Sequence, residues 1–154
     1  MSANPKSQAR SAARLGAVQA LYQYTMEGTQ IAFLLHEFHQ HRLGGEADPE
    51  VEDSQLADAE QAFFDDLVRG TIARLEEIDG LIEGRLAEGW ALARLDRTML
   101  QILRVGTYEL LARNDVPKAS VISEYVDVAH AFFDAREAKF VNGLLDAIAR
   151  QVRG

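Results

Sequence analysis

The chain has 154 residues, of which 47% are apolar and 26% are charged, and it contains no cysteine. This length fits one domain or two small subdomains, and the composition is ordinary for a globular protein. The lack of cysteine excludes disulfides and thiolate chemistry. Residues 1–8 lack the apolar core of a secretion signal, and no apolar stretch approaches the length of a membrane span. We therefore expect a cytoplasmic protein without a membrane partner.

The negative charge is concentrated in one segment. Residues 46–66 contain no Lys or Arg and hold nine acids: Glu46, Asp48, Glu50, Glu52, Asp53, Asp58, Glu60, Asp65 and Asp66. Removing these acids from the net charge of −8 leaves +1 on the rest of the chain. The chain before Glu27 has no acid and carries Lys6, Arg10 and Arg14. The acidity is therefore local and does not exclude a nucleic-acid partner.

Helical periodicity dominates the chain, and no segment alternates as a strand would. Gly28 and Gly70 are expected to end helices, and Asp96 to cap one. We predict an all-α fold of about seven helices. In chain order they run over residues 8–26, over 29–43, from Ser54 or Asp58 to Gly70, over 71–86, from Asp96 to Asn114, from Pro117 onward, and over 136–152.

Two of these helices carry more specific predictions. The first presents Ala13, Ala17 and Ala20 on one stripe, and such small side chains let a neighbouring helix approach closely. The helix that begins at Asp96 has apolar residues on several faces. A helix that is apolar most of the way round is expected to lie at the centre of the fold.

The sequence offers no catalytic, metal or cofactor site. It has no glycine-rich phosphate loop and no supported nucleophile arrangement. His36, His39 and His41 cluster, but a zinc site needs three or four converging ligands, so we interpret them as a solvated helix end. His130 stands alone and is expected at the surface or half-buried.

Arg10, Arg14, Val18 and Tyr22 lie four residues apart and form a ridge along the first helix. Such a ridge suits single-stranded RNA, because guanidinium groups contact phosphates and a ring stacks on an unpaired base, worth about 1–3 kcal/mol per base. The alternative is that Tyr22 packs in the core. Spacing alone favours the core, since aromatic residues at helical spacing are usually buried.

The segment 139–146 places Asn142 and Gly143 inside an otherwise apolar helix. Glycine there costs about 1 kcal/mol relative to alanine. Either Gly143 allows close helix packing, or Asn142 faces a partner. Phe140 lies about 100° around the helix from Val141, so it either fills a side pocket or is partly exposed and able to stack on a base.

Four ordered blocks carry a resemblance to a known family: residues 13–23, 103–111, 116–129 and 139–146. The second contains Tyr108-Glu109-Leu110-Leu111, and the last reads Lys-Phe-Val-Asn-Gly-Leu-Leu-Asp. With these blocks the chain resembles the NusB family of bacterial transcription antitermination factors over nearly its whole length.

The resemblance implies a single NusB-like RNA-binding domain over residues 1–154, built from two packed helical bundles at 1–70 and 71–154. It also implies a protein without enzymatic activity or cofactor. Such proteins pair with the ribosomal protein NusE and bind the boxA element of nascent ribosomal RNA transcripts. With other Nus factors they support processive elongation by RNA polymerase.

The resemblance reverses the core interpretation of Tyr22 and favours stacking for Phe140. With it, we favour close helix packing at Gly143 over a contact with RNA. It implies an RNA-binding set of Lys6, Arg10, Arg14, Tyr22, Lys139 and Phe140, and it assigns no residues to NusE. Because the first helix has few cations, we expect a partner to supply much of the RNA affinity. Three alternatives stay open: a protein–protein adaptor of the elongation complex that docks through the acidic segment, a homodimer, and the RNA-binding module of a methyltransferase, which would need a catalytic domain.

Overall fold

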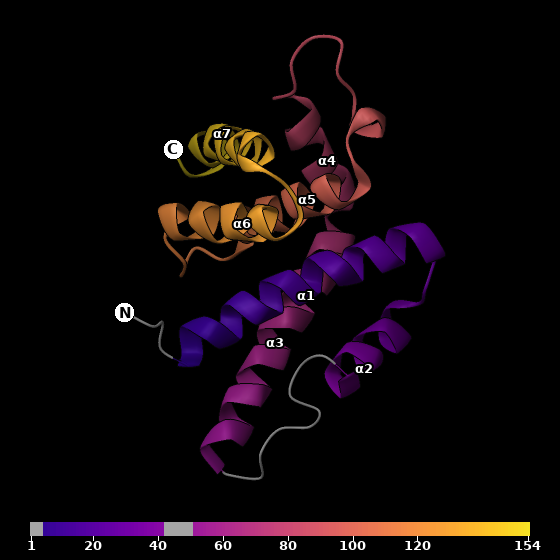
Figure 1. Cartoon of the computed structure of the whole chain (residues 1–154), viewed down its shortest axis with the longest axis vertical. Coiled ribbons are helices and arrows are strands. Elements are labelled where there is room, and N and C mark those ends of the chain that lie inside the picture. The colour runs from indigo at the N-terminus through magenta and orange to yellow at the C-terminus, as the bar shows by residue number, and fades with distance from the viewer. Residues whose placement is uncertain (1–4, 42–50) are drawn as a thin grey trace. The chain divides into compact units, whose positions relative to one another are not determined.

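The computed structural model describes the backbone of residues 5–41 and 51–154 and the side chains of residues 6–40 and 60–154. These residues form α-helices and one short 3₁₀-helix, and no strand occurs among them, which confirms the predicted all-α class (Figure 1). The helices are α1 (Pro5–Glu27), α2 (Ile31–His41), α3 (Val51–Ala73), α4 (Leu75–Glu83), η1 (Leu92–Arg94), α5 (Arg97–Ala112), α6 (Lys118–Phe132) and α7 (Ala135–Arg153).

The chain forms two compact units, Met1–Gly70 and Thr71–Gly154. The first unit contains α1, α2 and most of α3, and the second contains α4 to α7. Predictions that concern the side chain of His41 or the acids from Glu46 to Asp58 lie outside the described side chains.

The alanine stripe of α1 is buried, as predicted, with Ala13, Ala17 and Ala20 fully inaccessible to solvent. Gly28 ends α1, also as predicted. It has a φ of +69°, and its amide donates a hydrogen bond to the carbonyl of Tyr24 over 3.0 Å. This left-handed conformation is the usual glycine stop at a helix C-terminus.

Aromatic and histidine contacts join α2 to α3. The rings of Phe38 and Phe64 stack with their centroids 5.3 Å apart. His39 meets the edge of Phe64 and pairs with Asp65, Nε2 to Oδ1, over 2.6 Å. The prediction of a solvated histidine cluster is therefore wrong for His39, which is half-buried between the two helices, whereas His36 is exposed.

The expected boundaries of α3 are wrong at both ends. The helix begins at Val51, so neither Ser54 nor Asp58 caps it. It also continues through Gly70 to Ala73, and α4 begins only at Leu75. Gly70 does not adopt the positive φ of a helix stop, and a glycine with ordinary helical dihedrals merely weakens a helix without ending it.

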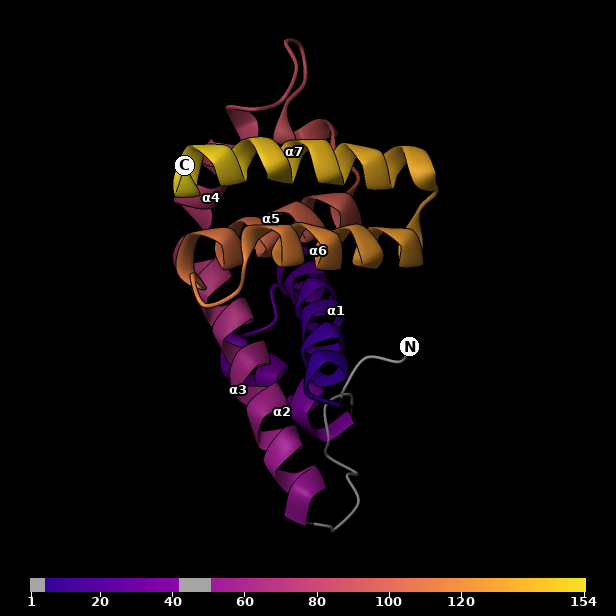
Figure 2. The same ribbon diagram turned by 90° about the vertical axis from the view of Figure 1, so that its left-hand side faces the viewer.

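In the second unit, α5 packs against α4, α6 and α7 (Figure 2). Every residue from Met99 to Leu110 is buried, which confirms the predicted central helix. The predicted cap is also present: Asp96 Oδ1 accepts hydrogen bonds from the amides of Thr98 and Met99 over 2.8 and 3.1 Å. This cap satisfies two amide donors at the start of the helix.

Several polar side chains in and around α5 are paired. Arg104 donates two hydrogen bonds to the carboxylate of Asp79 on α4, each 2.8 Å long. The Tyr125 hydroxyl donates to Glu109 Oε1 over 2.8 Å. The guanidinium of Arg153, at the end of α7, donates to the carbonyls of Glu109, Leu110, Arg113 and Val116 over 2.7–3.3 Å. Arg153 thereby binds carbonyls at the end of α5 and in the turn that follows it.

Gly106, and not Gly143, is the position of close helix packing. A Cβ added at Gly106 would lie 3.0 Å from Leu145 of α7 and 3.3 Å from Tyr125 of α6. A Cβ at Gly143 would meet nothing within 4 Å. The prediction that Gly143 permits close packing is therefore wrong. The segment around it turns Asn142 and Gly143 outward and buries Val141 and Leu145.

Candidate nucleic-acid interface

The RNA-binding residues expected on α1 differ in their exposure. Lys6 is exposed and Arg10 is half-buried, whereas Arg14 is only 4% exposed. Both guanidinium groups lie over the ring of Phe63, at 4.6 Å for Arg10 and 5.1 Å for Arg14. These cation–π contacts hold the two charges next to each other on one ring of α3.

The ridge expected on α1 is interrupted. Val18, at its middle, is buried along with Arg14, whereas Tyr22 is 39% exposed. Tyr22 is therefore not a core residue, in contrast to what spacing alone favours. The accessible part of this surface consists of Lys6 and Arg10 toward the start of the helix and Tyr22 toward its end.

The other two expected residues lie in the first half of α7. Lys139 is exposed, and Phe140 is 39% exposed, whereas Val141 beside it is fully buried. The spacing of α7 explains the difference, because Val141, Leu145 and Ile148 share the face that packs inward. Phe140 lies outside this face, so its aromatic ring is accessible from solvent.

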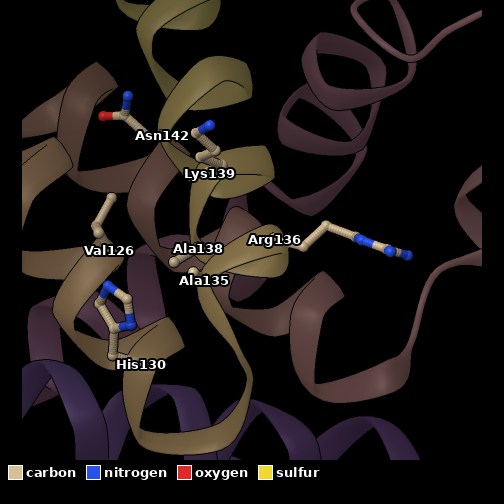
Figure 3. Close-up of a pocket in the computed structure, with 7 residues that line it drawn as sticks. All are labelled: Val126, His130, Ala135, Arg136, Ala138, Lys139 and Asn142. Carbon is tan, nitrogen blue, oxygen red and sulfur yellow. The ribbon is translucent and has the colours of Figure 1, made fainter.

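A cavity of about 570 Å³ lies where α6 meets the start of α7, and it is lined by Val126, His130, Ala135, Arg136, Ala138, Lys139 and Asn142 (Figure 3). His130 and Asn142 extend beside Val126, while the side chain of Arg136 extends away from His130. Hydrogen-bond donors on Lys139 and Asn142 thus border a concave surface. Such a surface suits phosphate and base-edge contacts with unpaired RNA.

A second cavity, of about 680 Å³, shares Arg136 with the first, and Phe140, Trp90, Arg94 and Glu137 also line it. Residue spacing assigned no role to Trp90, Arg94, Arg136 or Glu137. The available signal was the tryptophan itself: it sits in a Gly-Trp connection, where no helical periodicity requires an aromatic core residue.

The two basic residues near the C-terminus are used differently. Arg153 is bound to backbone carbonyls at the end of α5, as described above. Arg150 is exposed and pairs with Asp146 one turn earlier on α7. Within the described ranges, no group of three His, Asp or Glu side chains converges as metal ligands would, and no helix is long and apolar enough to cross a membrane.

Comparison with known sequences identifies one family. Residues 11–150 match the sequence profile of the NusB family. The chain is 68% identical to the transcription antitermination protein NusB of Novosphingobium aromaticivorans, over 94% of this chain and 95% of that protein. It is 49% identical to the protein of the same name from Caulobacter vibrioides, over 99% of each chain.

Solved structures show the same fold. A structure of NusB from T. maritima superimposes with a TM-score of 0.72 at 29% identity, covering 98% of this chain and 94% of that one. A structure of the antitermination factors NusB and NusE in complex with double-stranded RNA gives a TM-score of 0.71 at 26% identity, over 94% of this chain and 98% of that one. From the matched length and the identity to its relatives, this chain belongs to the NusB family.

Proposed function

We propose that this chain is a transcription antitermination factor that acts in the cytoplasm. With the ribosomal protein NusE, it binds the boxA element of nascent ribosomal RNA transcripts and supports processive elongation by RNA polymerase with other Nus factors. It works as a non-enzymatic RNA-binding subunit. Family membership, the names of its relatives and the solved NusB–NusE–RNA complex support this proposal.

The observation that carries the proposal is the exposed aromatic ring of Phe140 beside Lys139 on α7. Lys139 and Asn142 border one of the two cavities described above, and Phe140 lines the other. An accessible ring beside a cation and an amide provides stacking, phosphate contact and base-edge hydrogen bonding on one element. Core packing alone gives no reason to keep a phenylalanine here at 39% exposure.

The first unit contributes a second surface. Lys6 and Arg10 contact phosphates, Arg14 adds its positive charge from beneath the surface, and Tyr22 stacks on a base. About three neutralised phosphates on single-stranded RNA correspond to a slope of about −2 in log affinity against log salt. This shallow salt dependence implies that the chain alone binds weakly and that the NusE complex supplies much of the affinity.

The test is a titration of boxA RNA with the full chain, alone and with NusE, using wild type and two pairs of variants. Tyr22→Ala and Phe140→Ala should each weaken RNA binding about five- to hundredfold, the loss of one stacking contact. Phe33→Ala in the first unit and Phe132→Ala in the second remove other exposed phenylalanines and should leave RNA affinity unchanged.

Two results would overturn the proposal. One is nanomolar boxA binding by the isolated chain that NusE does not improve. The other is unchanged RNA affinity in both stacking variants, accompanied by weaker NusE binding, which would identify the chain as an adaptor with little direct RNA contact. Circular dichroism of each variant separates these results from loss of the helical fold.

A further inference from the structure

The connection between α4 and η1 exposes a large aromatic ring. Trp90 lies in this connection and is 53% exposed. An indole ring left in water forgoes the stabilisation that burial of its apolar area would bring. Core packing of this chain therefore does not account for a tryptophan at this position.

The connection holds Trp90 in a fixed place. Gly89, immediately before it, has a φ of +88°, a left-handed conformation that favours glycine. The Arg94 guanidinium lies 5.3 Å from the centre of the Trp90 ring and donates a hydrogen bond to the Gly89 carbonyl over 3.0 Å. Arg97 donates over 2.9–3.1 Å to three more carbonyls of the segment, those of Leu92, Ala93 and Leu95. The ring is therefore positioned before a ligand binds, which lowers the entropy cost of binding.

Trp90 and Phe140 line the same cavity, although they are distant in the sequence. The cavity has a volume of about 680 Å³ and lies within the second unit. Its other walls are largely apolar and include Leu86, Leu95, Met99 and Phe133. Arg136 lines this cavity and also the one that Lys139 borders. The proposed RNA surface around Phe140 therefore continues to Trp90 within the same unit.

The charges around the two cavities favour an anionic chain as the ligand. Three exposed cations line them, Arg94, Arg136 and Lys139, against two acids, Asp96 and Glu137. Asp96 Oδ1 already accepts two amide hydrogen bonds at the start of α5, and Glu137 Oε2 is buried away from solvent. The exposed cations are therefore placed to contact phosphates that flank a stacked base.

We propose that Trp90 is a further RNA-stacking residue: one unpaired base stacks on its indole ring, and a nearby base of the same strand stacks on Phe140. Every base presents a π face, so this contact requires no particular base and serves to hold the strand. Because both residues line one cavity, the two bases lie close together along the RNA. This inference rests on the proposed RNA-binding function and extends its surface to the connection before η1.

Trp90 reports on its own environment, because it is the only tryptophan in the chain. The fluorescence of the full chain is followed during titration with NusE alone and then with boxA RNA, after subtraction of the emission of NusE itself. A base stacked on the indole quenches its emission, so RNA should lower the Trp90 signal beyond any change that NusE produces. A change produced wholly by NusE would overturn the inference and assign the cavity to a protein partner.

Two substitutions separate stacking from apolar contact. Trp90→Leu keeps apolar bulk but removes the ring, and it should weaken boxA binding about five- to hundredfold, the loss of one stacking contact. Trp90→Phe keeps a ring and should retain most of the affinity. Phe132→Leu makes a similar change at a 42% exposed ring that does not line the cavity, and it should leave boxA affinity unchanged. Wild-type affinity in Trp90→Leu, or equal losses in Trp90→Leu and Trp90→Phe, would overturn the inference.

Abasic nucleotides identify the stacked base. BoxA RNAs that each lack one base are titrated against wild type and Trp90→Leu, with NusE present. At one position, removal of the base should weaken binding by wild type but not by the variant, because both changes remove the same contact. A nearby but different position should behave in this way with Phe140→Ala. Additive losses of base and indole ring at every position would contradict stacking on Trp90.

Failure of this inference differs from failure of the proposed function. If boxA binding in the presence of NusE depends on Phe140 and not on Trp90, the proposed function stands and the inference is wrong. If wild type with NusE does not bind boxA at all, the proposed function fails and the inference fails with it.

Discussion

The two units differ in what joins their helices. In the first unit, ring and cation contacts lie beside the half-buried His39–Asp65 pair: Phe38 stacks on Phe64, and Arg10 and Arg14 lie over Phe63. In the second unit, a central helix is buried along twelve consecutive residues and is joined to its neighbours by directional hydrogen bonds. The Arg104–Asp79 pair joins α5 to α4, and Arg153 joins the end of α7 to carbonyls at the end of α5.

This difference indicates how each unit accommodates a change in its side chains. Cation–π and stacking contacts tolerate small shifts, because they depend weakly on exact geometry. An Arg–Asp pair held by two hydrogen bonds tolerates such shifts poorly, because a displaced partner leaves a charge unpaired. A close helix contact at a glycine also tolerates them poorly, because the atoms then overlap. We therefore expect substitutions in the second unit to have the larger effects on stability.

The largest effect is expected for Asp79→Ala. It removes the carboxylate that accepts two hydrogen bonds from the mostly buried Arg104 guanidinium and leaves Gln101 Oε1, 3.3 Å away, as a neutral acceptor. The substitution should lower the free energy of unfolding by about 2–4 kcal/mol, slightly less than the loss of a fully buried pair because Asp79 is part-exposed. Urea denaturation followed by circular dichroism measures it. Glu76→Ala, an exposed position on the same helix, is the control and should change stability by about 0.5 kcal/mol or less. Equal effects of the two variants would show that the pair does not stabilise the unit.

Two glycine substitutions should change the stability of the fold in opposite directions. Gly106→Val places side-chain atoms against Leu145 and Tyr125, and the overlap should cost about 1–3 kcal/mol. Gly143→Ala adds a methyl group in open space and should stabilise α7 by about 0.5–1 kcal/mol through helix propensity. Thermal unfolding of both variants measures the contrast. Destabilisation by Gly143→Ala would restore the sequence-based expectation of close packing there.

A smaller effect is expected in the first unit for Phe63→Leu. The substitution keeps most of the apolar volume and removes the ring under Arg10 and Arg14, so it should cost about 1 kcal/mol. Hydrogen exchange resolved by residue should show faster exchange in α1 and α3 and unchanged protection in α5. If protection of α5 falls equally, the two units do not respond separately.

The helical framework could be predicted from the sequence where local chemistry determines it. Asp96 before an apolar run predicts a cap, and Gly28 after a periodic stretch predicts a stop, because the backbone groups involved lie within a few residues. Gly70 and Gly143 show where this fails. Whether a glycine ends a helix or admits a neighbour depends on the packing around it, which residue spacing does not contain.

The candidate site could likewise be predicted from the sequence only in part. The spacing of α7 places Phe140 away from Val141 and allows it to be exposed, but it does not bring Trp90 to the same cavity. Trp90 and Phe140 are separated by three elements of the chain, and nothing in the sequence distinguishes Glu137 from the many other acids. A cavity formed by a loop and a helix distant in sequence depends on tertiary packing, so these residues could not be grouped from the sequence.

The smallest effects concern two carboxylates whose pKa values move in opposite directions. Burial raises the pKa of Glu60 in the first unit. In the second unit, a hydrogen bond from Arg74 lowers the pKa of Glu77. An acid with a raised pKa in the folded state reduces stability once it is ionised, whereas an acid with a lowered pKa increases stability once it is ionised.

Glu60→Gln should therefore stabilise the chain at neutral pH, and Glu77→Gln should slightly destabilise it. The difference for Glu60 should fade as the pH drops below about 4, where its unfolded-state carboxyl is protonated as well. The difference for Glu77 should fade as the pH falls further, through the lowered folded-state pKa of that carboxyl. Because Glu77 is exposed, the stability difference between Glu77→Gln and wild type should also shrink with added salt. The stability difference for Glu60→Gln should persist, since desolvation and not a charge partner causes it. Urea midpoints measured across pH at two salt concentrations test this, and two differences of the same sign at neutral pH would contradict it.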